Sequence, residues 1–165
     1  MATRSELTSA LKDAGFRLTP QRTAICAALA AREDHPTAQS IHEELKQQYE
    51  SLSLTTVYQT LDSLVRIGAI RSLGTAGDDS VHYEPNIEPH INLACLTCHR
   101  IRDLESEAVR ELEREVSEAT GSKVLSGRVV YYSDCLLRAD PNECPFSSKV
   151  ADGTANTFGN VEPKR

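Results

Sequence analysis

Hydrophobic and polar positions follow a helical period over the first seventy residues. Apolar side chains recur every three or four positions, as Leu7 and Leu11 do behind Thr3, and the pattern restarts three more times. Each segment begins at a hydroxyl residue suited to cap a helix, namely Thr3, Thr19, Thr37 and Ser53. Gly15 and Gly68 follow the first and last segments, where glycine commonly ends a helix. The pattern therefore predicts four helices.

The period then changes to that of a hairpin. A short apolar run at 69–73, a turn at 74–79 and an alternating strand at 80–84 predict two antiparallel strands. Helices closed by a hairpin describe a winged helix, with the fourth helix as the recognition helix. Its solvent side carries hydrogen-bonding groups suited to base edges and phosphates, namely Thr55, Thr56, Tyr58, Gln59 and Asp62. An ordinary polar surface helix is the alternative.

The second half reads as a small α/β domain. We expect a strand through Cys95, a strand at 100–104, a helix ended by Gly121 and a β-rich run at 123–132. The expected buried positions of that helix are Val109, Leu112, Val116 and Ala119. Strand edges with so little core invite pairing with a second copy. The predicted class is α+β, with a winged-helix domain at 1–84, a two-proline hinge at 85–90, a dimerisation domain at 91–149 and a disordered tail at 150–165.

Composition and charge narrow the classes of function. Residues 1–75 carry eight basic and eight acidic side chains, so the net charge of −6 falls on the rest of the chain, and a neutral first half can still present a basic face to phosphates. No apolar run is long enough to span a membrane, and the N-terminus lacks an apolar signal core. Five cysteines, an odd number, fit metal binding in a reducing cytoplasm better than a disulfide framework. We therefore expect a cytoplasmic protein with no membrane contact.

Four cysteines of the second half predict a structural zinc site. Cys95 and Cys98 form a Cys-x-x-Cys pair, which supplies two thiolates from one tight turn. Cys135 and Cys144 would supply the other two, since the eight-residue loop between them can fold back at small extra cost. A redox pair is the rival interpretation, but such a pair favours a helix N-terminus, and here a strand is expected next.

Imidazole, carboxylate and amide side chains cluster around the hinge and predict a second metal site. The candidate ligands alternate along the expected strands and are His82, Glu84, His90, Asn92 and Asp103. His35 would join them only if the hinge folds the two domains together, and a metal bound there would fix the angle between the domains. Imidazole with carboxylate suits Fe(II), Mn(II) or Zn(II). Unrelated surface polar residues are the alternative.

Four stretches together resemble the ferric uptake regulator (Fur) family of metal-dependent transcriptional regulators. The stretches, in chain order, are 15–22, 35–38, 55–61 and a metal region made of 82–84 and 90–98, and the likeness extends over about residues 10–135. The resemblance implies a homodimeric winged-helix repressor that binds a palindromic operator in double-stranded DNA.

The resemblance also implies roles for individual residues. The regulatory ligands would be His35, Glu84, His90, Asn92 and Asp103, with Fe2+ or Mn2+ bound, while Zn2+ at the four cysteines would hold the dimerisation domain. Arg17 would enter the minor groove of DNA, and Tyr58 with Gln59 would meet bases in the major groove. Phosphates would be held by Thr19, Gln21, Arg22 and Thr56.

The residues at the regulatory site indicate which subgroup of the Fur family the chain resembles. Asp103 stands where peroxide sensors (PerR-like members) carry aspartate and iron sensors usually carry glutamate, and two histidines match those that peroxide sensors oxidise, His35 and His90. Asn92 departs from the pattern because a histidine is expected there, so His82 is a possible substitute ligand. His99 also departs, standing where glycine is usual. We expect release of DNA on peroxide oxidation; the alternatives are an iron- or other metal-level repressor, a zinc-ribbon interaction module and, remotely, a metalloenzyme.

Overall fold

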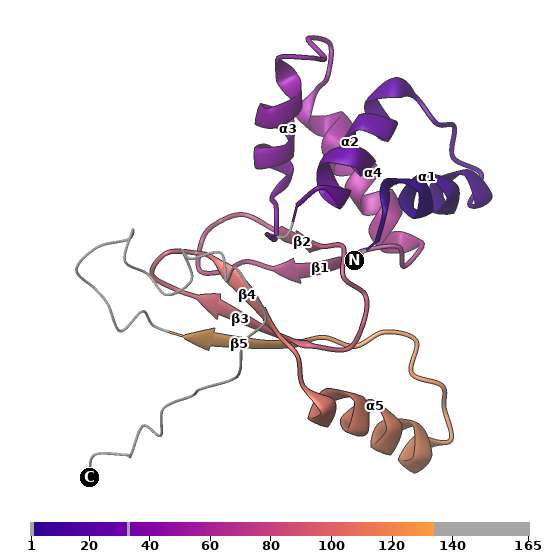
Figure 1. The fold of residues 1–165 in the computed structure, drawn as a ribbon, viewed down its shortest axis with the longest axis vertical. Coiled ribbons are helices and arrows are strands. Elements are labelled where there is room, and N and C mark those ends of the chain that lie inside the picture. The colour runs from indigo at the N-terminus through magenta and orange to yellow at the C-terminus, as the bar shows by residue number, and fades with distance from the viewer. Residues whose placement is uncertain (1, 33, 134–165) are drawn as a thin grey trace.

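The computed structural model describes residues 2–32 and 34–133, arranged as a helical unit and a sheet unit joined by residues 85–90 (Figure 1). The helical unit contains α1 (Arg4–Asp13), α2 (Pro20–Ala30), α3 (Ala38–Lys46), α4 (Leu54–Arg66), β1 (Arg71–Gly74) and β2 (His82–Glu84). The sheet unit contains β3 (Ile91–Cys95), β4 (Ile101–Leu104), α5 (Glu107–Thr120) and β5 (Val129–Ser133). The expectation of an α+β protein is confirmed.

Side-chain hydroxyls begin the first four helices as the sequence predicted. Thr3, Thr19, Thr37 and Ser53 each accept a hydrogen bond from the backbone N–H three residues on. Thr3 and Glu6 complete a capping box, because the Glu6 carboxylate also accepts the Thr3 N–H. The apolar faces of the helices meet in one core, whose fully buried members include Leu7, Leu11, Ile25, Leu29, Ile41, Val57, Leu61 and Leu64. Cys26 belongs to this core as a small buried residue.

Strands β1 and β2 pair antiparallel beneath the helices, with a bulge between Ser72 and Gly74. The segment before α3 runs along the free edge of β2. Tyr83 N–H donates to Pro36 O at 2.9 Å, and Thr37 bridges to His82. The segment that carries His35 is therefore held on the strand that carries Glu84.

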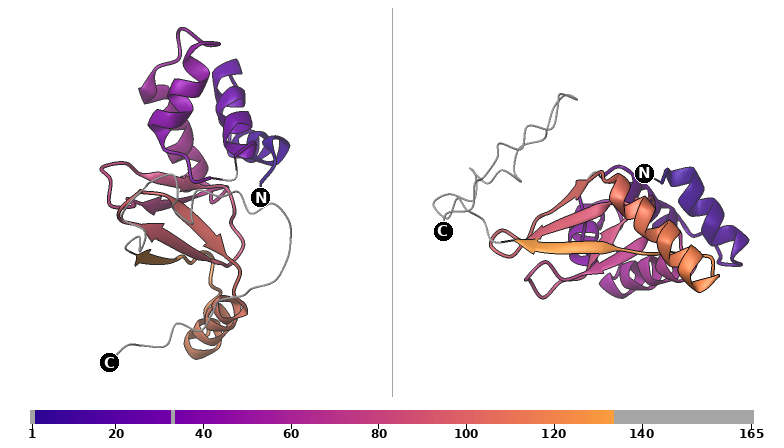
Figure 2. Two further views of the ribbon diagram at one scale, coloured as in Figure 1. Left: turned by 60° about the vertical axis from the view of Figure 1, so that its left-hand side comes forward. Right: turned by 90° about the horizontal axis from the view of Figure 1, so that it is seen from below.

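The sheet unit has strand order β4-β3-β5, in which β4 is antiparallel and β5 parallel to β3. In this register Asn92 lies opposite Asp103, so the two side chains share one face of the sheet. Helix α5 lies at the far end of the molecule from the helical unit (Figures 1 and 2).

Two expectations for this unit need correction. Val109 is buried, but Leu112 is 51% exposed and Val116 43% exposed, and Ala119 is exposed too, because residues 124–129 cover that face of α5 only in part. The β-rich run begins only at Val129, since residues 123–128 find no strand to pair with.

Several expectations lie outside the described residues. They concern Cys135, Cys144, the end of the second domain at 149 and the tail at 150–165. Within the described residues, no helix has the length and apolar character needed to cross a membrane.

Candidate functional site

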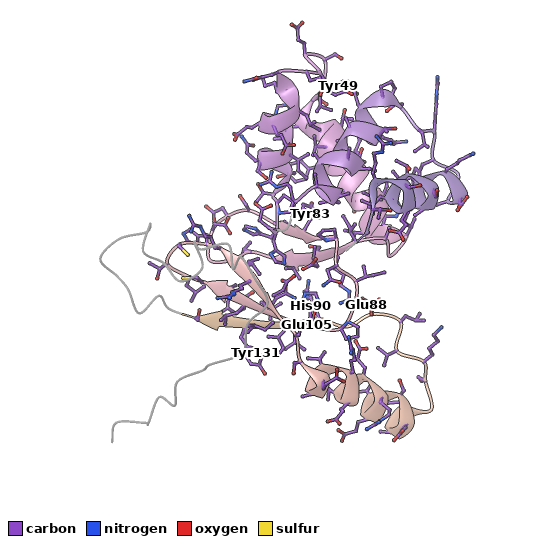
Figure 3. All side chains as sticks on the ribbon, viewed as in Figure 1. Tyr49, Tyr83, Glu88, His90, Glu105 and Tyr131 are labelled. Atoms are coloured by element: carbon purple, nitrogen blue, oxygen red, sulfur yellow. The ribbon has the colours of Figure 1, made fainter. Side chains whose placement is uncertain are left out.

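Four polar side chains converge where the helical and sheet units meet. His35 comes from the segment before α3 and Glu84 from the end of β2, while His90 precedes β3 and Asp103 lies in β4. His35, Glu84 and His90 are buried, and the Asp103 side chain is 36% exposed. Figure 3 shows His90 on the sheet side of this junction and Tyr83, next to Glu84, on the helical side. The cluster thus draws on both units and opens to solvent at one carboxylate.

The distances within the cluster are those of a shared cation site. His35 Nε2 lies 2.6 Å from Glu84 Oε2 and 2.8 Å from Asp103 Oδ1. His90 Nε2 lies 3.3 Å and 3.6 Å from the same two oxygens, near enough for attraction but directed at neither as a hydrogen bond. Ligand atoms of His35, Glu84 and Asp103 all fall within 4.8 Å of one another, so a single ion could touch them all.

These short contacts shift the pKa values of all four side chains. Burial disfavours a charged His35 ring, but hydrogen bonding to Asp103 and Glu84 outweighs it and raises the pKa of His35 to about 9. Attraction to Asp103 and Glu84 raises the pKa of His90 to about 10. Burial opposes ionisation of both carboxyls, yet the neighbouring imidazoles hold the pKa of Glu84 and of Asp103 below the usual range. Two protonated rings thus balance two carboxylates, and a divalent cation carries the same charge as those two protons.

The hydrogen bonds of the two histidines leave nitrogen atoms available as ligands. His90 Nδ1–H donates to Glu88 O at 2.7 Å, which leaves the other nitrogen, Nε2, 3.3 Å and 3.6 Å from the carboxylate oxygens of Glu84 and Asp103. Three buried polar atoms near this site have no hydrogen-bond partner among the described residues, namely His35 Nδ1, His90 Nε2 and Asn92 Oδ1. Two imidazoles and two carboxylates suit a divalent transition metal. The buried Asn92 Oδ1, an acceptor without a donor, also suits a metal, because a bound ion would give it a partner.

Asn92 is the fifth residue that the sequence placed here. It is buried, and its register opposite Asp103 puts it on the same sheet face. Its unpaired Oδ1 can serve as an oxygen donor, although an amide binds metal more weakly than the imidazole expected at this position.

His82 is turned away from the cluster. Its Nδ1–H donates to His35 O at 2.7 Å, and its Nε2–H donates to Asp78 Oδ2 at 3.1 Å. Both ring nitrogens are thus engaged with other partners. Sequence reasoning missed Asp78, although an aspartate in a glycine-rich turn four residues before a histidine is a recognisable local signal.

The Cys95–Cys98 turn lies between β3 and β4 at the opposite end of the sheet unit from α5 (Figure 2). Burial opposes ionisation of Cys95, but N–H groups of Cys98 and Thr97 bond to the sulfur and lower the pKa of the thiol. Cys98 leads toward β4 rather than into a helix. Backbone N–H groups aimed at sulfur favour a thiolate that binds metal.

The residues expected to meet DNA lie in or beside α2 and α4 of the helical unit. Gln21 Nε2 donates to Ser51 Oγ at 3.1 Å, which brings the start of α2 beside the start of α4. Arg22 donates to Arg17 O and lies over the Phe16 ring. Arg17, Tyr58 and Gln59 are exposed, whereas Thr19 and Thr56 are half-buried and engaged in the helix caps.

A fold of this kind, with such a cluster between its units, is found in a known class of metal-responsive regulators. The model of the Ferric uptake regulator family matches residues 13–132, and the chain belongs to that family. Members of the family are transcriptional regulators that bind DNA as dimers. A curated relative, the peroxide-responsive repressor PerR of Staphylococcus aureus (strain Mu50 / ATCC 700699), is 33% identical over 130 residues, or 79% of this chain and 87% of the relative.

Solved structures agree with this assignment. The chain resembles the Vibrio cholerae ferric uptake regulator with a TM-score of 0.62 and 25% identity, over 78% of this chain and 98% of the other. It resembles the Campylobacter jejuni peroxide stress regulator with a TM-score of 0.60 and 28% identity, over 81% and 96% respectively. The family resemblance of the sequence is confirmed.

Proposed function

We propose that this protein is a metal-dependent, DNA-binding repressor that releases DNA when peroxide oxidises a histidine of its regulatory metal site. The observation that carries the proposal is the cluster itself, in which His35 of the helical unit meets Glu84, His90 and Asp103. A divalent ion bound there would tie the two units together and set the position of the DNA-binding surface. Without the ion, protons on His35 and His90 balance the charge of the two carboxylates, but they do not link the units by coordinate bonds as a metal would.

The regulatory ligands are His35, Glu84, His90 and Asp103, with Asn92 as an additional oxygen donor. Fe2+ or Mn2+ suits this mixed nitrogen and oxygen set. Zn2+ at Cys95 and Cys98, completed by Cys135 and Cys144, would hold the sheet unit by its thiolates. Relatives of similar fold include a zinc-bound manganese uptake regulator and a ferric uptake regulator bound to manganese, consistent with both kinds of ion.

Peroxide sensing is favoured over metal-level sensing by the exposed carboxylate and the buried imidazoles. The Asp103 side chain is 36% exposed to solvent, while His35 and His90 are buried next to where the ion would sit. Bound Fe(II) would activate peroxide, and an imidazole would supply the two electrons that reduce it, so that one peroxide oxygen enters a ring C–H bond and the other leaves as water. The imidazole of either histidine is then the nearest oxidisable group, and an added oxygen would alter its ligand nitrogens. The PerR relative supports the same interpretation.

A homodimer would be formed through the sheet unit. Leu112 and Val116 leave an apolar stripe exposed on α5, and apolar surface of this kind commonly marks a contact with another chain. Two DNA-binding surfaces related by twofold symmetry would then fit a palindromic operator. Arg17, Tyr58 and Gln59 lie on the exposed surface that would face it, with Thr19, Gln21, Arg22 and Thr56 near the phosphates.

Mass spectrometry of the two histidine peptides tests the peroxide step. Anaerobic protein loaded with Fe(II) is exposed to slightly more than one equivalent of peroxide, and a Mn(II)-loaded sample is the matched control. One added oxygen on His35 or His90, absent from the control, is expected. If iron is bound and both histidines stay unmodified, the peroxide step is wrong and a metal-level repressor of the same family becomes the better account.

A further inference from the structure

The turn between β1 and β2 does not project freely from the helical unit but packs on the cysteine turn of the sheet unit. Ala76 is fully buried there. A Cβ added to Gly77 would lie 2.9 Å from Leu96 Cδ2 and 3.4 Å from Leu96 Cα, so the two turns are in direct contact. This contact joins the two units at a second place, separate from the histidine–carboxylate cluster.

His99 makes the polar part of this contact. Its Nδ1–H donates to Ala76 O at 3.0 Å, across the boundary between the units. Among the described residues His99 is the one non-glycine residue with a positive φ, 58°. That conformation is uncommon for residues other than glycine, and asparagine, aspartate and histidine adopt it more often than other side chains do. A histidine kept there is consistent with a role for its ring, and the ring bonds to Ala76.

A chain of hydrogen bonds runs from Ala76 to the metal cluster. Ala76 N–H donates to Asp78 Oδ1 at 3.0 Å, and the same carboxylate accepts the His82 Nε2–H. The other nitrogen of His82 donates to His35 O at 2.7 Å. His82 is buried, so these bonds are shielded from water. This series of hydrogen bonds therefore ends at the backbone carbonyl of His35, the cluster residue that precedes β1 in the sequence.

From this arrangement we infer that His99, Asp78 and His82 are positioning residues that hold His35 in the metal cluster through the β1–β2 turn. None of the three would be a ligand of the ion, because the hydrogen bonds of their side chains go to other protein atoms. His82 fixes the backbone of His35, Asp78 orients His82, and His99 anchors the turn that contains Asp78. The inference rests on the proposed function, because it concerns the affinity of the regulatory metal site.

A consequence is that the two metal sites are linked. His99 follows Cys98 directly, and its own N–H donates to Cys95 O at 2.9 Å. Any change in the cysteine turn that moves His99 also moves the anchor of the chain that holds His35. The state of the cysteine turn would thereby alter the affinity of the regulatory site without a change in its ligands.

A matched pair of substitutions isolates the His99 hydrogen bond. His99→Gly removes the ring but suits the positive φ, so the fold is kept. His99→Asn also tolerates this φ, and its amide nitrogen lies as many bonds from Cα as Nδ1 does, so it can still donate to Ala76 O. Asp78→Ala breaks the chain at a second point.

Two readouts are taken on full-length, zinc-containing protein. Hydrogen exchange of the Ala76 amide, measured before Mn2+ is added, reports whether the turn is anchored. Titration with Mn2+ then gives the affinity and stoichiometry of the regulatory site. In His99→Gly we expect faster exchange and about 10-fold weaker Mn2+ binding at unchanged stoichiometry, with both values near wild type in His99→Asn. Asp78→Ala should weaken binding similarly, and the His99→Gly/Asp78→Ala double variant should lose little more than either single variant.

The inference is overturned if His99→Gly speeds exchange at Ala76 while Mn2+ affinity stays at the wild-type value. It is also overturned if exchange at Ala76 does not change. Failure of the wild-type protein to bind Mn2+ would instead contradict the proposed function, and the exchange data would still show whether the turn is anchored.

Discussion

His35 Nε2 lies 2.8 Å from Asp103 Oδ1, although the two residues belong to different units of the molecule. The pairing brings a carboxylate of the sheet unit to an imidazole of the helical unit. A ligand that strengthens it would favour one relative placement of the two units.

The first prediction concerns pH and metal affinity. Because the pKa of His35 is about 9 and that of His90 about 10 in the metal-free protein, both rings carry protons at neutral pH, and Mn2+ must displace them. Affinity should therefore rise by about 10- to 100-fold per pH unit between about pH 6.5 and 8.5, for one or two protons released. Calorimetry in buffers of different ionisation enthalpy counts these protons. An affinity independent of pH would contradict the assignment of the histidines as ligands.

The same pKa shifts determine how the stability of the metal-free protein against unfolding depends on pH. The histidine pKa values are raised, so their stabilisation is complete below about pH 6.5 and is lost as pH rises through 9 to 10. The carboxyl pKa values are lowered, so their stabilisation is lost as pH falls below about 4.5. Thermal unfolding should show greatest stability between these limits. Added Mn2+ should shift the optimum upward in pH.

Replacement of the amide at position 92 tests whether this residue is a ligand. Asn92→Asp keeps the shape but puts a third carboxylate beside Asp103, so the metal-free protein should lose about 1–3 kcal/mol of stability. Mn2+ should bind more tightly, because a charged oxygen replaces a neutral one. Unfolding with and without Mn2+ measures both effects. Weaker Mn2+ binding would mean that the side chain at this position faces away from the ion.

The exposed side chain of Tyr58 tests the DNA-binding surface. Tyr58 is 45% exposed on α4, so Tyr58→Ala should leave folding and dimerisation intact. Loss of a base contact should weaken DNA binding by about 1–3 kcal/mol. The probe is a duplex selected from a random pool by the Mn2+-loaded protein, read by fluorescence anisotropy. Glu118→Gln, an exposed change in α5, is the control, and equal affinity for both variants would exclude Tyr58 from the interface.

The apolar stripe on α5 tests the dimer. Burial of Leu112 should contribute about 1.5–3 kcal/mol per chain, and a dimer buries two copies. Leu112→Asp should therefore raise the dimer dissociation constant by about 100-fold or more. Sedimentation velocity measures this against Glu111→Gln, a neighbouring exposed change. A variant that stays fully dimeric would place the interface elsewhere.

Local signals in the sequence predicted the helical unit closely. Hydroxyl caps and glycine stops depend on a few neighbouring residues, and Thr3, Thr19, Thr37 and Ser53 all cap helices as expected. Strand positions were also anticipated, because residue types alternate along them. Boundaries moved by a few residues where pairing partners decided them, as at Val129.

Contacts between distant segments were harder to anticipate. Alternation put His82 and Glu84 on one strand face, but it could not reveal that the His82 ring would bond Asp78 and the backbone of His35. The His99 contact with Ala76 depends on how two turns of different units pack. The period of α5 predicted an apolar face, but it could not reveal that the other described residues would leave Leu112 51% exposed.

Mn2+ titration of wild-type protein and His35→Ala tests the central claim most directly. The claim is that one regulatory ion is bound by ligands from both units. We predict one Mn2+ per chain in the wild type, and a loss of affinity of at least about 100-fold in His35→Ala, with the helical content unchanged. Equal Mn2+ affinity in the two proteins would contradict the account, because the ion would then be held by the sheet unit alone.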